Sequence, residues 1–438
     1  MPIVGDSNAK LRPIRLFAAF APGDHVRAHR EVLARGTAST TSLAFSEQLF
    51  NYCKAAGYPI LAISSHPRVD RIEDGVIIAE NRRKQPGEAQ PSGLAFHLLQ
   101  LKWACYLAYR AWRFGADVAF IDSGTSHYFA LTLFRLAGIR VVANLHNVLW
   151  PQGFPPASLS GRIVRRLNQQ FFRRIAAGAI GVSPECERQV LSEARNAIPF
   201  FQYRCQFSRD GFHQAQGYRD GPFHLMFAGR VEADKGVFDL VAISDILKTR
   251  CTTPVVIHVC GDGGALPALR DLVRGKQLDA AIIIHGHLAR ERLLELYHSC
   301  HAVIVPTTST FPEGMPQVCA EAVIAGLPIV ASKVTNALDV LGPSIAEAET
   351  NDPTSYADQI RRLATEPAFY DRLRSATKGL SVQFFDRTQS YPAAVDRMLS
   401  KLFADQTRTS DWGRIYGDPP DGAAARSEPP GTARWTAS

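Results

Sequence analysis

The feature that most constrains the fold is a regular alternation of short apolar runs and longer helical patterns between residues 223 and 331. Apolar runs of strand length occur at 223–228, 255–259, 281–285, 302–305 and 329–331. Segments with helical spacing of apolar residues separate them, at 237–249, 265–274, 290–298 and 317–325. Because parallel strands need crossover connections, this alternation predicts a parallel sheet covered by helices on both faces.

The N-terminal half repeats the alternation less regularly. Strand candidates lie at 14–20, 60–64, 118–121, 141–145 and 179–182, and helix candidates at 41–56, 96–114, 127–137 and 159–176. A polar, turn-rich stretch then separates the halves. We predict an α/β protein with Rossmann-like βαβ domains at 1–205 and 223–406, a linker at 206–222 and a disordered tail at 407–438. Ligands should bind in the crevice at the carboxyl ends of the strands.

Composition excludes several classes of protein. The chain has 438 residues, of which 46% are apolar and 21% charged, the balance of a globular protein with large cores. No apolar run approaches the ~20 residues that cross a bilayer, and the N-terminus lacks a secretory pattern. The eight cysteines form no C-x-x-C pair, which argues against zinc and disulfides and favours free thiols in the cytoplasm.

The net charge of +8 is unevenly spread. Several arginines crowd the segment Arg162–Arg174, namely Arg162, Arg165, Arg166, Arg173 and Arg174. A solvated helix face explains them, and so does attraction to anionic lipid or to a pyrophosphate-bearing acceptor. Nucleic acid is not expected as a partner, because no aromatic residues are interleaved as a stacking platform.

The first of four motifs is the loop from Gly229 to Gly236, between a predicted strand and helix. A glycine after a strand lets the backbone turn sharply toward the crevice. Arg230 and Lys235 are then two fixed cations suited to a diphosphate, Arg through bidentate hydrogen bonds and Lys as a point charge. Two solvated surface cations remain the alternative.

Two further βα loops carry glycines. Gly261 lies in Cys-Gly-Asp-Gly-Gly at 260–264, and Gly286 and His287 lie in His-Gly-His-Leu at 285–288. Glycine there allows the backbone to approach a ligand, although many βα turns use it for structural reasons alone. No third ligand accompanies the two histidines, so a metal site is not expected. Contact with a nucleotide base or ribose is the better interpretation.

The fourth motif, from Pro312 to Ala322, is the most informative. Pro316 fits the first position of a helix, which leaves the N–H groups of Gln317 and Val318 facing the crevice. Glu313 then precedes the helix and Glu321 lies within it. Carboxylates accept hydrogen bonds from vicinal hydroxyls, so one could hold a sugar and the other a ribose. Ordinary surface glutamates are the alternative.

Taken in order, the four motifs resemble the C-terminal half of retaining glycosyltransferase family 4, which has the GT-B fold. The resemblance covers about 223–340 and implies that Arg230 and Lys235 bind the donor diphosphate and stabilise the leaving group. Glu313 would hold the donor sugar and Glu321 the ribose. The backbone at Glu313, Gly314, Met315 and Pro316 would line the sugar pocket, where Pro316 replaces a glycine common in the family.

The resemblance also implies a reaction. It is transfer of a hexose from a UDP- or GDP-linked donor to a hydroxyl acceptor, with retention and without a metal or other cofactor. The N-terminal domain would bind a saccharide or lipid-linked acceptor and the C-terminal domain the donor. A cytoplasmic enzyme of polysaccharide or glycolipid biosynthesis is expected, with Arg162–Arg174 as a candidate contact with the inner membrane face.

The N-terminal half departs from the family pattern. A Gly-Gly loop that contacts phosphate is replaced by Ala-Pro-Gly-Asp at 21–24, and Gly36 or the Ser/Thr cluster at 39–42 is the candidate substitute. Asp122 or His127 could orient or deprotonate the acceptor hydroxyl, and His146 resembles a family histidine that ends the next strand. The departure keeps open the alternative of a catalytically degenerate homologue that acts as a nucleotide-sugar-binding or regulatory protein. A sugar-nucleotide epimerase on the same fold is a third class, although no residues demand it.

Overall fold

The computed structural model describes residues 12–35, 41–84, 91–209 and 211–404. The N-terminal domain contains the strands β1 (Leu16–Phe20), β2 (Ile60–Ser64), β3 (Asp70–Asp74), β4 (Ile77–Asn81), β5 (Val118–Asp122), β6 (Arg140–Leu145), β7 (Gly178–Gly181) and β8 (Phe200–Gln202). Its helices are α1 (His25–Arg35), α2 (Phe45–Ala56), α3 (Gly93–Phe114), η1 (Tyr128–Leu131), α4 (Thr132–Leu136), α5 (Leu159–Arg174) and α6 (Pro184–Ala194).

The C-terminal domain contains the strands β9 (Phe223–Ala228), β10 (Val255–Cys260), β11 (Ile282–Gly286), β12 (Ala302–Val305), β13 (Ile329–Ala331) and β14 (Ile345–Glu347). Its helices include η2 (Ala233–Lys235), α7 (Asp239–Arg250), α8 (Leu266–Gly275), α9 (Arg290–Ser299), α10 (Gln317–Ile324), α11 (Leu338–Leu341), α12 (Pro353–Thr365) and α13 (Pro367–Ser381). The last described helix of the chain is α14 (Tyr391–Leu402).

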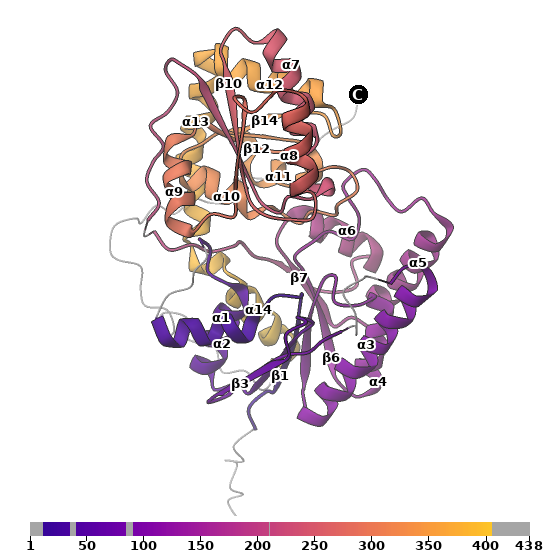
Figure 1. The fold of residues 1–438 in the computed structure, drawn as a ribbon. Coiled ribbons are helices and arrows are strands. Elements are labelled where there is room, and N and C mark those ends of the chain that lie inside the picture. The colour runs from indigo at the N-terminus through magenta and orange to yellow at the C-terminus, as the bar shows by residue number, and fades with distance from the viewer. Residues whose placement is uncertain (1–11, 36–40, 85–90, 210, 405–438) are drawn as a thin grey trace, which may run out of the picture.

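Two sheets define the two domains, which lie one above the other in Figure 1. The first has the order β3-β4-β2-β1-β5-β6-β7-β8 and is parallel except for the β3–β4 hairpin. The second has the order β11-β10-β9-β12-β13-β14 and is parallel throughout. The predicted α/β class with two parallel-sheet domains is therefore confirmed.

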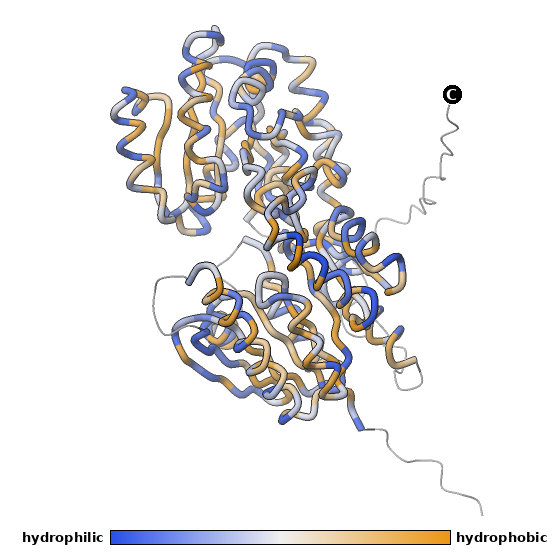
Figure 2. The backbone as a smooth tube through the Cα atoms, turned by 90° about the vertical axis from the view of Figure 1, so that its right-hand side faces the viewer, coloured by the Kyte–Doolittle hydropathy of each residue, from blue (hydrophilic) through white to orange (hydrophobic). Residues whose placement is uncertain are grey.

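Apolar strands buried on both faces explain why the sheets form. All five residues of β1 are buried, as are those of β12 at the centre of the second sheet. Burial on both faces is characteristic of parallel sheets with helices on each side. Figure 2 shows apolar segments running through the interior of both domains, with polar segments on the outer turns.

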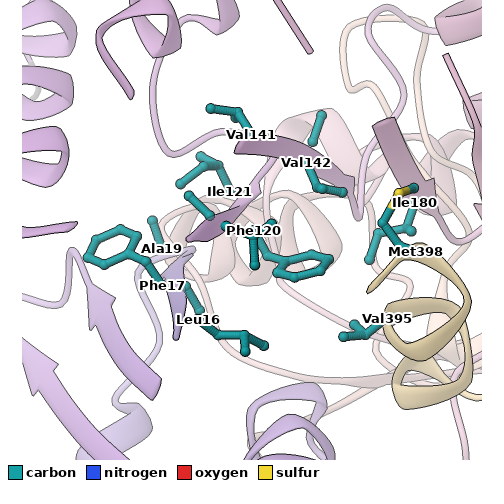
Figure 3. Close-up of a cluster of buried hydrophobic side chains, with 14 of the residues drawn as sticks. Leu16, Phe17, Ala19, Phe120, Ile121, Val141, Val142, Ile180, Val395 and Met398 are labelled. Carbon is teal, nitrogen blue, oxygen red and sulfur yellow. The ribbon is translucent and has the colours of Figure 1, made fainter. Parts of the chain in front are cut away.

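The helix α14 corrects the predicted domain boundary. The sequence assigned 223–406 to the C-terminal domain, but Tyr391, Val395 and Met398 of α14 are buried in the N-terminal core. Figure 3 shows Val395 and Met398 beside Ile180 of β7, and Figure 1 shows α14 beside α2. The apolar stripe of α14 explains why this helix returns to the N-terminal domain, since an amphipathic helix packs where its apolar side is covered. The predicted tail at 407–438 lies outside the described residues.

Other differences are local. The sequence analysis missed α1 and the hairpin of β3 and β4, whose outer strand alternates exposed and half-buried residues and so lacks an apolar run. The helix predicted from residue 41 begins at Phe45. Pro316 is the N-cap of α10 rather than its first residue.

Four histidines form a row across one face of the C-terminal sheet. His224 lies on β9, His258 on β10, His285 on β11 and His301 directly before β12. Nδ1 of His224 lies 2.9 Å from Nε2 of His258, and Nδ1 of His258 lies 2.9 Å from Nε2 of His285. The backbone N–H of His224 donates to Nδ1 of His301 at 2.9 Å. Neutral imidazoles satisfy these contacts, because each ring can donate from one nitrogen and accept at the other.

We predict that acid weakens the C-terminal domain through this row. Burial, together with the neighbouring histidines, lowers the pKa of His258 and of His301 from 6.5 to about 4. Between pH 6.5 and 4 the unfolded chain therefore takes up protons that the folded chain excludes. The free energy of unfolding should fall by roughly 2 kcal/mol for His258 at pH 5.

Urea unfolding at pH 7 and pH 5 measures this difference. His258→Gln should shrink the difference by about the amount that His258 contributes. His213→Gln, at an exposed position of the same domain, is the matched control and should preserve it. An unaltered pH dependence in the His258 variant would show that the row does not govern acid stability.

Candidate active site

The predicted donor loops meet at the carboxyl ends of β9, β10 and β11. The Gly229 N–H donates to the carbonyl of Cys260 at 3.0 Å, and the Gly261 N–H donates to the carbonyl of Gly286 at 2.8 Å. At Gly261, φ is +145° and an added Cβ would lie 1.8 Å from the Gly229 carbonyl oxygen. Only glycine fits this contact, so the three glycine loops form one hydrogen-bonded edge.

Two cations and one carboxylate gather around an aromatic ring at this edge. Lys235, in η2, forms an ion pair with Glu313. The Lys235 Nζ atom lies 3.9 Å from the centroid of the Phe311 ring, and the Arg230 guanidinium carbon lies 5.4 Å from it. The Arg230 residue is exposed, whereas the Lys235 and Glu313 side chains are 16% and 9% exposed. The structure thus brings Arg230, Lys235 and Glu313 together.

The strand order explains this convergence. The chain leaves β9 toward β10 on one side of the sheet and later returns to β12 on the other side. The loops after β9 and β12 therefore flank the point where the order reverses, where open α/β sheets bind ligands. Gly236 holds the two loops close, because a Cβ at that position would lie 2.0 Å from the Pro306 carbonyl oxygen.

Glu321 lies apart from that cluster, buried in α10. Its carboxylate accepts a hydrogen bond from the Tyr297 hydroxyl at 2.6 Å and another from Thr41. Burial raises the pKa of Glu321, and the bonds from Thr41 and Tyr297 oppose that rise. Both carboxylate oxygens are engaged, so a ribose would have to replace Thr41 or share its oxygen.

The segment containing Thr41 crosses from the N-terminal domain. Besides the Thr41 contact, Ser42 Oγ donates to Gln317 Oε1 at 3.0 Å, in the first turn of α10. Part of the Ser/Thr cluster predicted to replace the missing Gly-Gly loop therefore touches the donor side. The remaining candidates at 36 and 39–40 lie outside the described residues.

A second contact between the domains involves Glu313 and Gly314. Asn147 and Glu313 form an isolated antiparallel bridge. A Cβ on Gly314 would lie 1.8 Å from the carbonyl oxygen of His146, so the two backbones are in direct contact. Met315 packs against hydrophobic clusters of both domains. The loop that carries Glu313 is therefore held by the N-terminal domain as well as by its own.

Asp122 ends β5 and is buried. Its carboxylate accepts hydrogen bonds from Asn144 Nδ2 at 2.7 Å and from the Ala21 N–H at 3.3 Å, and lies 3.2 Å from Nε2 of His146. The Tyr203 hydroxyl donates to Asn144 Oδ1 at 2.7 Å. Asp122 thus orients the half-buried His146, which makes His146 the more accessible group of the pair.

His127 belongs to a different cluster. Its Nε2 atom lies 2.9 Å from Nδ1 of His97 on α3, and its ring stacks on Phe129. Burial lowers the pKa of His127, and His97 and Lys84 lower it further. Burial also lowers the pKa of Lys84 to about 8. The two predicted acceptor-side residues are therefore held by different partners, Asp122 by His146 and His127 by His97.

The other predicted residues occupy the loop edge or the start of α10. His287 is exposed after β11, and Gln317 and Val318 form the first positions of α10 after the cap Pro316. Sequence reasoning missed Phe311 and Tyr203. Phe311 could have been found from the sequence, because it is an aromatic residue directly before Pro312-Glu313. No local sequence pattern indicates Tyr203, which contacts His146 only in the folded structure.

Comparison with known proteins finds a family match in the C-terminal half. Residues 208–379 match the family model of glycosyl transferases group 1. The match lies within the C-terminal half and covers less than half of the chain. It includes the glycine loops, Arg230, Lys235, Glu313 and Glu321, and agrees at this coarser level with the resemblance read from the sequence.

The curated relatives are distant. A glycogen synthase of Mycobacterium tuberculosis is 30% identical over 175 residues, which cover 38% of this chain and 40% of the relative. A D-inositol 3-phosphate glycosyltransferase of Catenulispora acidiphila is 29% identical over 294 residues, which cover 61% of this chain and 67% of the relative. The chain thus spans about two fifths of the length of the first of these relatives.

Solved structures support the fold of the whole chain. The sucrose-phosphate synthase of Thermosynechococcus elongatus has a TM-score of 0.68 at 16% identity, covering 90% of this chain and 100% of that structure. An Anabaena protein determined in complex with UDP has a TM-score of 0.57 at 16% identity, with the same coverage. At these identities the likeness shows the GT-B fold alone.

Two searches of the described residues were negative. None of their helices is long and apolar enough to span a bilayer. No group of three or more His, Cys, Asp or Glu side chains among them is arranged to hold a metal ion.

We predict that Gly314→Ala separates the domains. The added methyl group cannot fit against the His146 carbonyl, so the contact should open while each domain stays folded. Turnover should fall about tenfold or more, because small displacements of reacting groups are costly. Small-angle scattering should show a larger radius of gyration. Gly275→Ala, at a position with open space around it, is the control, and an unchanged radius in Gly314→Ala would contradict the prediction.

Proposed function

We propose that this protein transfers a sugar from a nucleotide-sugar donor to a hydroxyl acceptor, with retention of configuration. The observation that carries the proposal is the gathering of Arg230, Lys235 and Glu313 around Phe311, at the reversal point of the C-terminal sheet. The match of residues 208–379 to the model of glycosyl transferases group 1 supports it. So do relatives named glycogen synthase and D-inositol 3-phosphate glycosyltransferase.

The ion pair between Lys235 and Glu313 suggests how donor binding proceeds. Each group neutralises the other in a largely buried setting, where an uncompensated charge would be costly. An arriving diphosphate supplies the negative charge that Lys235 needs, which frees Glu313 to accept hydrogen bonds from the donor sugar. Arg230, exposed beside them, adds a second cation for the departing nucleoside diphosphate.

The remaining roles follow from position. Glu321 would receive the ribose hydroxyls in place of Thr41, and the exposed N–H groups at the start of α10 would face the donor. The glycines at 229, 261 and 286 would allow the backbone to approach the nucleotide. We propose that no metal is needed, because two cations and a helix N-terminus can take the leaving-group charge.

On the acceptor side we propose His146, oriented by Asp122, as the group nearest the reacting hydroxyl. His127 and its partner His97 would contact a more distant part of the acceptor. A saccharide or lipid-linked acceptor, in polysaccharide or glycolipid synthesis on the cytoplasmic side of a membrane, fits this arrangement. The basic segment Arg162–Arg174 would then lie near that membrane.

Ligand-observed NMR with a panel of UDP-, GDP- and ADP-sugars, without added metal, tests the donor site. One donor should bind selectively, and Lys235→Ala should weaken its binding about 10- to 100-fold, since it removes a charge-assisted contact. Lys276→Ala is the matched control, because Lys276 pairs with Asp245 on the outer surface of the same domain. Equal binding by both variants would refute the role of Lys235.

Three other outcomes change the proposal. Binding that requires Mg²⁺ would contradict metal independence. Selective donor binding without turnover on any acceptor would favour the degenerate, nucleotide-sugar-binding homologue. Conversion of donor without acceptor would indicate the epimerase.

We predict that Glu313→Gln separates nucleotide binding from sugar recognition. The neutral side chain releases Lys235 from its ion pair, so free nucleoside diphosphate should bind as tightly as before or more tightly. The advantage of the complete sugar nucleotide over the diphosphate should fall about tenfold. Isothermal titration with both ligands measures the two affinities, and a parallel loss of both would show that Glu313 does not read the sugar.

A further inference from the structure

The outer face of α3 is apolar although it faces solvent. Exposed large apolar residues occur there in two runs with spacings of three and four, Leu94, Leu98 and Leu101 near the start and Tyr109 and Trp112 near the end. Leu94 is 73% exposed and Trp112 is 60% exposed. A solvent-facing helix normally carries polar residues on that side. Contiguous apolar surface of this kind marks an interaction site.

The inner face of the same helix is apolar as well. Trp103, Leu107 and Ala111 are buried in the N-terminal core. Core packing therefore does not explain the outer residues, which continue along a helix of 22 residues, about 33 Å in length. Tyr109 and Trp112 lie close together near its C-terminal end, with ring centroids 6.3 Å apart. Such rings are typical of the boundary between lipid and water.

The neighbouring helix α5 adds aliphatic and basic residues. Leu159, Ile163 and Leu167 are exposed at successive turns, and Arg162 and Arg166 are exposed between them. Both α3 and α5 pack on η1, and Figure 1 shows them on the same side of the N-terminal domain. That side faces the viewer in Figure 2, where its helices carry both apolar and polar residues. The two helices thus present one surface, here called the α3–α5 face.

The charge on the α3–α5 face is of one sign. Neither α3 nor α5 contains an Asp or Glu residue. Arg165 and Arg173 turn inward, since Arg165 pairs with Glu193 and Arg173 donates to the Glu193 carbonyl. Within the described part of the chain, exposed Arg162 and Arg166 have no acidic partner. They are available to an external anion.

We infer that the α3–α5 face docks on an anionic lipid bilayer. Apolar side chains of α3 insert at the headgroup boundary, and the arginines of α5 meet lipid phosphates. A symmetric dimer is disfavoured, because a twofold contact would place this unbalanced positive surface against itself. The arrangement differs from a basic patch alone, since the apolar face of α3 supplies a second anchoring signal.

Docking would also orient the crevice. The N-terminal part of α3 lies beside the loop after β5, where the Ser126 hydroxyl donates to the Gln100 carbonyl at 2.9 Å and His97 meets His127. A bilayer on the α3–α5 face therefore lies next to the acceptor edge of the sheet. This orientation, unlike the docking itself, rests on the proposed transfer to a lipid-linked or saccharide acceptor.

Co-sedimentation of the full chain with vesicles tests the surface. Vesicles of phosphatidylcholine alone are compared with vesicles of equal parts phosphatidylcholine and phosphatidylglycerol, at low and high NaCl. The chain should sediment with the anionic vesicles and lose most binding at high salt. The double variant L98Q/W112Q should lower partitioning about tenfold or more, as should R162E/R166E.

Val382→Gln is the matched control, because Val382 is a 60% exposed apolar residue of the C-terminal region. It should bind as the unmodified chain does. The inference is overturned if binding is the same with and without phosphatidylglycerol, or if neither double variant weakens it. A dimer by light scattering that becomes monomeric in L98Q/W112Q would assign the face to a second copy instead. Sedimentation needs no sugar donor, so failure of docking and failure of sugar transfer are distinguishable.

Discussion

The contact between Gly314 and the His146 carbonyl is the constraint on which the crevice depends. A residue with any side chain at 314 would force the domains apart, since even a Cβ would lie 1.8 Å from that oxygen. The loop carrying Glu313 is held from both sides, by Asn147 of the N-terminal domain and by Asn336 of its own domain. Glu313 and His146, for which we propose donor-side and acceptor-side roles, therefore lie at one interface, although they come from different sheets.

The N-terminal domain is thus more than a neighbour of the proposed donor site. Thr41 and Ser42 reach Glu321 and Gln317, and α14 returns from the far end of the chain to complete the N-terminal core. Each domain contacts a segment of the other, so movement of the two domains relative to each other must break specific polar contacts. A bound donor would take the place of Thr41 beside Glu321 and the place of Glu313 beside Lys235. Contacts between protein groups would thus be exchanged for contacts with the ligand, which is a physical route from donor binding to domain movement.

The regularly repeated strands could be predicted from the sequence, whereas the edge hairpin and the domain to which α14 belongs were not predicted. The strands at 60–64, 223–228, 302–305 and 329–331 are found with the predicted bounds, because buried parallel strands are continuous apolar runs. The β3–β4 hairpin was missed because its outer strand is half exposed, although Asp74-Gly75 was a usable turn signal. The domain membership of α14 could not be read locally, since an amphipathic stripe does not say which sheet it covers.

The candidate site likewise contains residues that could be predicted from the sequence and residues that could not. Arg230, Lys235 and Glu313 were predictable because each follows a strand on the edge where loops converge, and their convergence needs only the strand order. The partners of Asp122 were not, because the Asp122–His146–Tyr203 group joins strands and a segment far apart in sequence. The cation contacts of Phe311 could not be predicted either: its neighbours in sequence suggest a loop, and only the fold brings its ring close to two cations. What a loop residue does is decided by the contacts that the scaffold imposes on it, and a local pattern carries no record of them.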